Sequence, residues 1–203
     1  MIKVAAVVLA AGRSSRFRAA GGAEETKLIA TLDGEPIIRR VVQAALVSRA
    51  SPVVVVVGHA RAAVEAALAG LAATVAFNPD YATGLASSLR VGLRATPAGA
   101  GGALVLLGDM PRVEAPLIDA LIDAFEAQPN ALAVAPTQGG RRGNPVLLGR
   151  ALFGRAMLLD GDEGARRLLG ALPKSDVVEI AATGSDAAFD IDTPSDLAIV
   201  RRS

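Results

Sequence analysis

The most regular feature of the sequence is a series of short apolar runs, each of which ends at a glycine or at a polar residue. Three of these runs, residues 3–9, 53–57 and 103–107, are apolar at almost every position. The middle run consists of five consecutive valines. Strands that are buried on both faces of a parallel sheet have this composition. We therefore predict that these three runs are central parallel strands.

The remaining segments alternate between helical and extended patterns. The predicted helices comprise residues 36–48, 60–69, 115–127 and 194–202. The further predicted strands comprise residues 74–77, 132–135, 145–148 and 177–180. Such alternation predicts βαβ connections throughout, and thus a Rossmann-like α/β fold of three layers (αβα) with a mostly parallel mixed sheet. A length of 203 residues fits one domain that covers residues 1–203.

The composition excludes several classes of function. The chain has 21 Lys and Arg against 20 Asp and Glu, and only 3% of its residues are aromatic. Nucleic-acid binding is not expected, because it needs a basic surface and stacking side chains. Without cysteine and with one histidine, the chain has no thiolate or all-histidine metal site, but carboxylates can still hold a hard metal. Apolar runs shorter than 18 residues and the lack of a signal sequence predict a cytoplasmic protein without membrane contact.

The segment that follows the first predicted strand has the properties of a phosphate-binding loop. Gly12 and Ser14 are small, so the backbone can approach a ligand closely, and backbone N–H groups can bind phosphate oxygens. Arg16 and Lys27 add positive charge. This combination indicates a polyphosphate ligand, although the spacing matches neither the dinucleotide-binding fingerprint nor the P-loop. A surface loop with solvated arginines explains the pattern equally well.

Two acidic segments are candidates for a magnesium site. Asp109 directly follows a buried strand, and Mg²⁺ is usually held by one or two carboxylates together with substrate phosphates. Asp190 supplies the second acid. In an extended segment Asp190 and Asp192 share a face, but Asp192 also stands where a residue would cap the helix that begins near Pro194. We predict that Asp109 and Asp190 bind the metal and that Asp192 is the helix cap.

Three further polar segments are open to two interpretations each. Residues 78–88 form a long polar turn that opens a helix, and this turn can read a base or ribose or can serve only to cap the helix. Residues 138–145 and 161–166 are polar, Gly-rich loops that are either solvated surface or the site of an anionic acceptor. His59 is expected to form a cap or a local hydrogen bond and not to act as a catalytic base.

Together these residues resemble a known family. Leu9-Ala10-Ala11-Gly12, with Ser14, Arg16 and Lys27, resembles the nucleotide-binding signature of the nucleotidyltransferase superfamily, which includes the molybdenum cofactor guanylyl- and cytidylyltransferases. Residues 78–89, 108–111, 142–146, 161–166 and 190–194 resemble the cytidylyltransferase branch in the same order along the chain. Ala-Ala-Gly at positions 10–12 is similar to the CTP-using enzymes, whereas the GTP-using enzymes usually have Ala-Gly-Gly.

The resemblance implies a Mg²⁺-dependent transfer of CMP from CTP to the molybdenum cofactor, a phosphorylated pterin, with a molybdoenzyme or its chaperone as a further partner. It implies that the catalytic residues are Arg16, Lys27 and Asp109. It implies that the metal is bound by Asp109 and Asp190. The implied nucleotide-binding residues are Leu9, Ala10, Ala11, Gly12, Ser14, Asn78, Gly84, Ser87 and Ser88. The implied acceptor-binding residues are Arg142, Asn144 and Arg166.

The chain departs from the family pattern at two places. Residues 18–25 are longer than the usual spacing before the lysine, which leaves the position of Lys27 open. Asn144 stands where a histidine is common, and asparagine cannot carry a positive charge toward an anionic acceptor. Two alternatives therefore remain: transfer from GTP or to another phosphorylated acceptor such as a sugar phosphate, and a nucleotide-binding accessory protein for molybdoenzyme maturation that releases no pyrophosphate.

Overall fold

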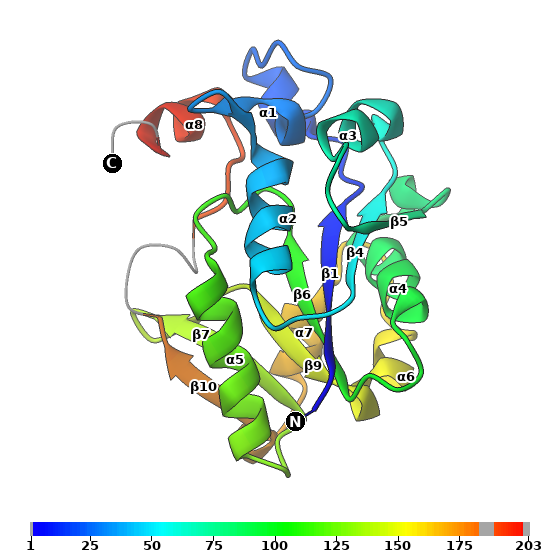
Figure 1. The fold of residues 1–203 in the computed structure, drawn as a ribbon, viewed down its shortest axis with the longest axis vertical. Helices are drawn as coiled ribbons and strands as arrows, with labels where there is room; N and C mark the ends of the chain where they lie inside the picture. Colours follow the sequence, from blue (N-terminus) through cyan, green and yellow to red (C-terminus); the bar gives the residue numbers. More distant parts are fainter. Residues whose placement is uncertain (1, 183–188, 201–203) are drawn as a thin grey trace.

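An eight-stranded sheet forms the centre of the computed structural model, which describes residues 2–182 and 189–200 (Figure 1). Its strands are β1 (Val4–Ala10), β4 (Val53–Val57), β5 (Thr74–Phe77), β6 (Gly102–Leu107), β7 (Ala133–Gln138), β8 (Arg141–Arg142), β9 (Val146–Gly149) and β10 (Val177–Ala181). Their order is β10–β7–β9–β6–β1–β4–β5, and β8 pairs with β7. β2 (Thr31–Leu32) and β3 (Glu35–Pro36) form a separate antiparallel pair.

The three predicted central strands are confirmed as β1, β4 and β6. All residues of β1 and β4 are buried, and so are nearly all those of β6. The strands run parallel, with Leu9 opposite Leu107 and Ala10 opposite Val57. This register brings their carboxyl ends to nearly the same level. Residues that follow these strands are therefore gathered at one edge of the sheet.

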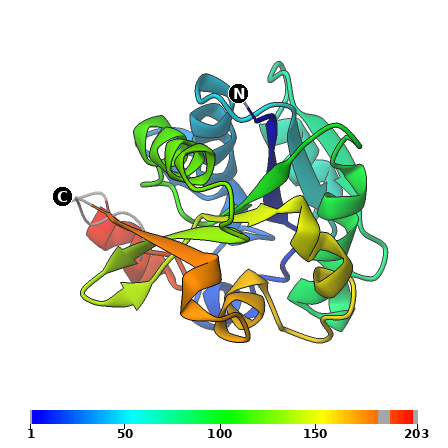
Figure 2. The same ribbon diagram turned by 90° about the horizontal axis from the view of Figure 1, so that it is seen from below.

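Helices cover both faces of the sheet, which confirms the predicted three-layer α/β fold (Figure 2). On one face lie α2 (Ile37–Val47), α3 (Arg61–Ala67) and α5 (Ala115–Ala127). On the other face lie α4 (Leu85–Ala95), α6 (Phe153–Ala156) and α7 (Ala165–Gly170). Neighbouring valines of β4 pack alternately on the two faces of the sheet, because successive side chains of a strand point in opposite directions. Val55 packs with the α2 layer and Val56 with the α4 layer.

One strand differs from the predicted βαβ pattern. Residues 145–148 were expected as a strand, and the structure has β9 there, but β9 runs antiparallel to both of its neighbours, β6 and β7. Only residues 139–145 separate β7 from β9. A parallel return needs a crossover of about a dozen residues or more, so a connection this short can only turn back antiparallel. The Asn144–Pro145 peptide bond in this connection is cis.

A third apolar cluster joins two segments that are far apart in the sequence. Phe17 of α1 (Ser15–Ala19) packs in it with Ile191, and with Leu197 and Val200 of α8 (Pro194–Val200). Both helices lie at the top of Figure 1, beyond the carboxyl ends of β1 and β6. The helix predicted over residues 194–202 is confirmed up to Val200, and its last two residues lie outside the described part of the chain. The cluster brings the C-terminal segment to the loop that follows β1.

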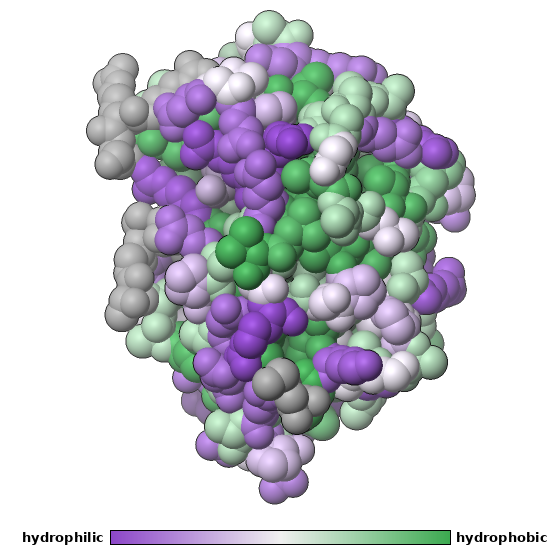
Figure 3. All heavy atoms as spheres, viewed as in Figure 1, coloured by the Kyte–Doolittle hydropathy of each residue, from purple (hydrophilic) through white to green (hydrophobic). Residues whose placement is uncertain are grey.

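The surface shows few large apolar side chains. On the face seen in Figure 1, apolar residues gather around the middle, and hydrophilic residues lie above and below them (Figure 3). Among the described residues, the two most exposed large apolar side chains are Val47 at 80% and Leu158 at 84%. Val47 ends α2 on one face of the sheet, and Leu158 follows α6 on the other face. None of the helices within residues 2–182 and 189–200 combines the length and apolarity needed to cross a membrane.

Candidate active site

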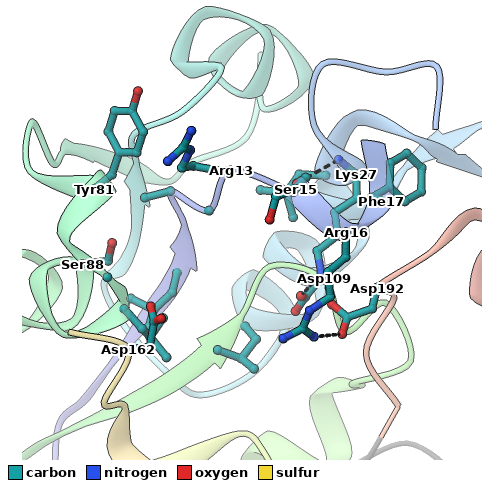
Figure 4. Close-up of a pocket in the computed structure, with 18 of the residues that line it drawn as sticks. Arg13, Ser15, Arg16, Phe17, Lys27, Tyr81, Ser88, Asp109, Asp162 and Asp192 are labelled. Atoms are coloured by element: carbon teal, nitrogen blue, oxygen red, sulfur yellow. Dashed lines mark hydrogen bonds and ion pairs between the residues drawn. The ribbon is translucent and has the colours of Figure 1, made fainter. Parts of the chain in front are cut away.

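A cleft of about 520 Å³ opens at the carboxyl ends of β1 and β6 (Figure 4). It lies between the loop after β1, the turn that precedes α4, and the segment that precedes α8. The lining residues are Leu9, Ala11, Gly12, Arg13, Ser14, Ser15, Arg16, Phe17, Lys27, Leu28, Tyr81, Ala82, Gly84, Leu85, Ser88, Leu107, Asp109, Asp162 and Asp192. The cleft therefore collects most of the residues for which the sequence predicts a role in nucleotide binding or catalysis.

The loop after β1 is held in shape by Ser14 and Thr26. Ser14 has a left-handed backbone, with φ of 51°. Its Oγ lies 2.9 Å from Oγ1 of Thr26, which is fully buried, and accepts a hydrogen bond of 3.1 Å from the backbone N–H of Lys27. These bonds tie the two ends of the long segment together. They bring Lys27 to the cleft despite the extra residues at 18–25, at the first position of the 3-10 turn Lys27–Ile29.

Lys27 forms the centre of an ion cluster. Its Nζ lies 2.7 Å from Oδ2 of Asp109 and 2.9 Å from Oδ1 of Asp192, and Arg16 pairs with the second oxygen of Asp192 at 2.5 Å. Burial by itself lowers the pKa of Lys27, but Asp109 and Asp192 outweigh that effect and raise it above its usual value. Lys27 is therefore a permanent cation at neutral pH.

The two paired carboxylates differ in their titration. Burial raises the pKa of Asp109 above its usual value, although the charge of Lys27 opposes the rise. Burial also acts to raise the pKa of Asp192, but hydrogen bonds and charges from Lys27 and then Arg16 lower it below its usual value. The difference follows from exposure, because the Asp109 side chain is 18% exposed and that of Asp192 is 34% exposed.

Three acidic groups fit a divalent cation: Asp109 and Asp192 line the cleft, whereas Asp190 does not. One carboxylate oxygen each from Asp109, Asp190 and Asp192 lies within 4.8 Å of the others. Oδ1 of Asp109 is buried and has no hydrogen-bond partner among the described residues, so it is available to a metal. Ile191 holds the arrangement, because its backbone N–H donates to the Asp109 carbonyl at 3.0 Å and its fully buried side chain packs near Phe17. Oxygen ligands of this kind suit Mg²⁺ or Mn²⁺.

The prediction that Asp192 caps the last helix is wrong. Thr193 and Asp196 cap α8 instead: Oδ2 of Asp196 accepts from the Thr193 backbone N–H at 2.7 Å, and Oγ1 of Thr193 accepts from the Asp196 backbone N–H at 3.3 Å. This reciprocal pair is a capping box that uses aspartate, and it leaves Asp192 free to face Lys27. Sequence reasoning missed Asp192 as a site residue. The signal was its alternation with Asp190, which places both on one face of an extended segment.

An Asp192→Asn variant should lose stability in a pH-dependent way. The folded-state pKa of Asp192 lies below the ordinary value of 3.8, so its contribution is present above that value and is lost as the pH falls through the lowered pKa. The variant should be less stable than the wild type near neutral pH, and the difference should shrink in acid. Urea unfolding with EDTA at about pH 7 and about pH 3 measures this. Asp160→Asn, in an exposed loop outside the cluster, is the control, and a constant difference between wild type and Asp192→Asn would contradict the assignment.

The turn before α4 contains both supporting and cleft-facing residues. The amide nitrogen of Asn78, which is 1% exposed, donates to Oγ of Ser87 at 2.9 Å and to Oγ of Ser88 at 3.0 Å. Gly84 and Ser88 line the cleft, whereas Asn78, Ser87 and Ala10 do not. Asn78 and Ser87 stabilise the turn through these buried hydrogen bonds. A direct contact of any of the three with a nucleotide stays a prediction.

The predicted acceptor residues are not among those that line the cleft. Arg142 donates to Glu179 at 2.7 Å and to the Leu169 carbonyl at 3.3 Å. Asn144 precedes the cis bond to Pro145, and Arg166 is exposed on α7. Because β9 runs antiparallel to both β6 and β7, the carboxyl ends of β6 and β7 share an edge, which puts Arg142 on the same edge as Asp109. Their role in acceptor binding stays a prediction.

Three polar or aromatic lining residues had no individual role assigned to them from the sequence. Arg13 and Tyr81 stand at one side of the cleft, and Asp162 stands near Ser88 (Figure 4). The ring centroid of His59, the single histidine of the chain, lies 6.0 Å from that of Tyr81, and the His59 backbone N–H donates to the Ala11 carbonyl. The structure does not bear out the predicted cap, because α3 has no side-chain cap at its N-terminus and Nε2 of His59 is buried without a hydrogen-bond partner among the described residues. Residues 161–166 were marked as a segment, but within it the sequence assigned a role only to Arg166, which carries the charge expected to bind an anionic acceptor.

Comparison with known proteins identifies the family. Residues 6–177 match the model of the MobA-like NTP transferase domain. The chain is 33% identical over 207 residues to the purine catabolism protein PucB of Bacillus subtilis, covering 97% of this chain and 95% of PucB. It is also 33% identical over 135 residues to the bifunctional protein GlmU of Anaeromyxobacter sp. strain K. That match covers 65% of this chain but only 27% of GlmU.

The solved structures agree with this assignment. Rv0371c of Mycobacterium tuberculosis H37Rv is 27% identical, with a TM-score of 0.83, and the match covers 100% of this chain and 99% of that one. A second structure of Rv0371c is a complex with manganese; it is 26% identical, has a TM-score of 0.82, and matches over 99% of both chains. The family model, the full-length relative and the fold all lead to the same conclusion. This chain belongs to the family of MobA-like NTP transferase domains.

Proposed function

We propose that this nucleotidyltransferase transfers CMP from CTP to the molybdenum cofactor, with Mg²⁺ as cofactor and pyrophosphate as the leaving product. The observation that carries the proposal is the position of Lys27. Its Nζ bridges Asp109 and Asp192 in the same cleft that Gly12, Ser14 and Arg16 line. A cleft with small residues and fixed cations on one side and carboxylates beside them fits a metal-bound triphosphate.

The proposed reaction needs positioning and charge neutralisation more than proton transfer. A phosphate oxygen of the acceptor forms a bond to the α-phosphorus of CTP, and the bond from that phosphorus to the oxygen that links it to the β-phosphorus breaks. Pyrophosphate leaves with the electron pair. Because the second pKa of a phosphate monoester is about 6, the attacking oxygen is already ionised at neutral pH and needs no general base. Lys27 and Arg16 neutralise charge on the phosphoryl oxygens, and the backbone after β1 orients them.

Asp109, Asp190 and Asp192 are the residues that would hold the divalent cation. When bound, the cation neutralises negative charge on the phosphates. The manganese complex of Rv0371c supports a divalent metal in this family. We propose Mg²⁺ because the candidate ligands are all carboxylate oxygens, which suit this hard ion. The charge of Lys27 next to the same carboxylates keeps the cluster from carrying several uncompensated negative charges before the metal arrives.

The choice of CTP and of a pterin acceptor rests on the motifs. Ala-Ala-Gly at positions 10–12 resembles the CTP-using enzymes, and Leu9, Ala11 and Gly12 line the cleft. Arg142, which pairs with Thr137 at the carboxyl end of β7, and Asn144, which lies just before β9, are proposed to lie on the acceptor side. A molybdoenzyme or its chaperone is the proposed recipient of the product. Product analysis separates this acceptor from a sugar phosphate, and pyrophosphate release separates an enzyme from an accessory nucleotide-binding protein.

Nucleotide binding should depend on both the base and the metal. A ligand present at 100 times its dissociation constant stabilises the folded protein by about 2.7 kcal/mol, which thermal unfolding detects. We expect the largest rise in Tm with CTP and Mg²⁺, and a smaller rise when EDTA replaces the metal. ATP, GTP and UTP are the comparison nucleotides. The decisive assay is pyrophosphate release from CTP with the molybdenum cofactor; a preference for GTP would move the protein to the guanylyl branch, and binding without release would contradict an enzymatic role.

A further inference from the structure

The loop between α6 and α7 forms a fixed wall of the cleft. The backbone N–H of Ala86 donates to the Gly161 carbonyl at 3.0 Å, and the guanidinium of Arg90 donates to the Leu159 carbonyl. Gly84 has φ of 114°, and a Cβ at this position would lie only 2.2 Å from the Gly161 carbonyl oxygen. The backbone of this loop is thus in direct contact with the start of α4. A side chain that projects from it into the cleft has a defined position.

Asp162 is that side chain. It lines the cleft and is exposed, and no hydrogen bond or ion pair of its carboxylate is present among the described residues. The next residue, Glu163, behaves differently, because it pairs with Arg167 at 2.7 Å. In Figure 4, Asp162 lies near Ser88, on the side of the cleft opposite Lys27, Asp109 and Asp192. The cleft therefore has a carboxylate without a partner at the end away from its lysine.

The two ends of the cleft differ in the ligand groups they can accept. Arg16 and Lys27 attract phosphates to one end. A second anionic group would be repelled at the Asp162 end, where the carboxylate accepts hydrogen bonds but cannot donate them. A ligand that extends across the cleft is therefore favoured when it presents N–H or O–H donors to this wall. Rings that carry an exocyclic amino group satisfy this condition, and rings with an oxygen in the same place do not.

We propose that Asp162 is a specificity-determining residue that accepts hydrogen bonds from the amino edge of an aminopyrimidine ring in the cleft. Two sources of this chemistry exist within the proposed function, on which the inference rests. One is the amino group of cytosine in CTP, and the other is the amino group with the adjacent ring N–H of a pterin. Both present donors to one carboxylate, and charge-assisted bonds of this kind are among the stronger hydrogen bonds.

Two matched pairs of ligands separate the sources. UTP differs from CTP by an oxygen in place of the amino group, and a lumazine differs from the corresponding pterin in the same way. Dissociation constants for all four are measured by calorimetry with Mg²⁺ on the wild type, Asp162→Ala, Asp162→Asn and the loop control Asp160→Asn. We expect the wild type and the control to prefer the amino member of one pair by about 10-fold or more. Asp162→Ala should abolish this preference.

The asparagine variant gives an independent check. Its amide can donate as well as accept, so Asp162→Asn should improve binding of the oxo member relative to the amino member. A change confined to CTP and UTP assigns Asp162 to the nucleobase, and a change confined to pterin and lumazine assigns it to the acceptor. Preferences that are absent in the wild type, or that survive in Asp162→Ala, overturn the inference. Failure of the proposed function has a different signature, which is the absence of pyrophosphate release by the wild type.

Discussion

An Asp109→Asn variant is expected to lose about 10²–10³-fold in kcat, because it removes one charge from the position where the phosphates and the metal meet. Asp109 supplies a buried Oδ1 without a partner and an Oδ2 that lies 2.7 Å from Nζ of Lys27. The amide has nearly the same shape but no charge, so it can neither hold a divalent cation as well nor orient the lysine. Pyrophosphate release at saturating CTP measures the loss.

The fold of this variant should survive. Burial raises the pKa of Asp109, which means that the folded protein already disfavours its charged form, and a neutral amide removes that cost. Circular dichroism and thermal unfolding check this. Asp123→Asn is the matched control, because Asp123 is an exposed aspartate that pairs with Arg49 on the surface, and surface pairs contribute only about 0–1 kcal/mol. Full turnover by Asp109→Asn would remove Asp109 from the proposed metal site.

A Lys27→Met variant should lose about 10²–10³-fold in kcat and should also be less stable. Methionine keeps much of the length of the lysine side chain but removes the cation that faces the phosphates. It also leaves Asp109, whose side chain is 18% exposed, without its partner. Breaking a buried pair from one side costs up to about 3–5 kcal/mol. We expect urea unfolding to show the loss of stability and pyrophosphate release to show the loss of turnover.

The stability loss in Lys27→Met should grow as the pH rises. Without Lys27, only a backbone hydrogen bond still opposes the effect of burial on Asp109, so its folded-state pKa moves further above the ordinary value of 3.8. An acid with a raised folded-state pKa is fully tolerated below the unfolded value and costs stability as the pH rises through the folded pKa. Mg²⁺ should restore part of the stability but not the turnover. Lys174→Met, at an exposed lysine, is the control, and undiminished kcat in Lys27→Met would contradict the catalytic assignment.

Much of the fold could be predicted from the chain itself. The five valines of β4 and the apolar runs of β1 and β6 have few stable alternatives to a sheet buried on both faces, and the structure places all three at its centre. The direction of β9 could not be read in the same way. Strand periodicity is the same for parallel and antiparallel strands, and only the short connection across residues 139–145 decides which one forms.

The candidate site also contains residues that local sequence could identify and one that it could not. Local sequence marked Gly12, Arg16, Lys27 and Asp109, because each stands where a strand ends or a small flexible loop begins. It assigned Asp192 wrongly, since a residue just before a proline-led helix has the same local signature whether it caps the helix or faces a distant lysine. In the structure Asp196 caps the helix, because its carboxylate accepts a hydrogen bond from the Thr193 backbone N–H, and Asp192 is not needed there.

The α/β class, the three central strands and the loop with the candidate phosphate-binding residues could be predicted from the chain alone, because they depend on hydrophobic pattern and local backbone chemistry. The bridge from Lys27 to Asp109 and Asp192, and the position of Asp162 in the same cleft, follow only from how distant segments pack. Packing between Phe17 and Ile191 brings together segments that lie more than 160 residues apart. Contacts over such separations depend on how the layers pack, and no local pattern in the chain encodes them.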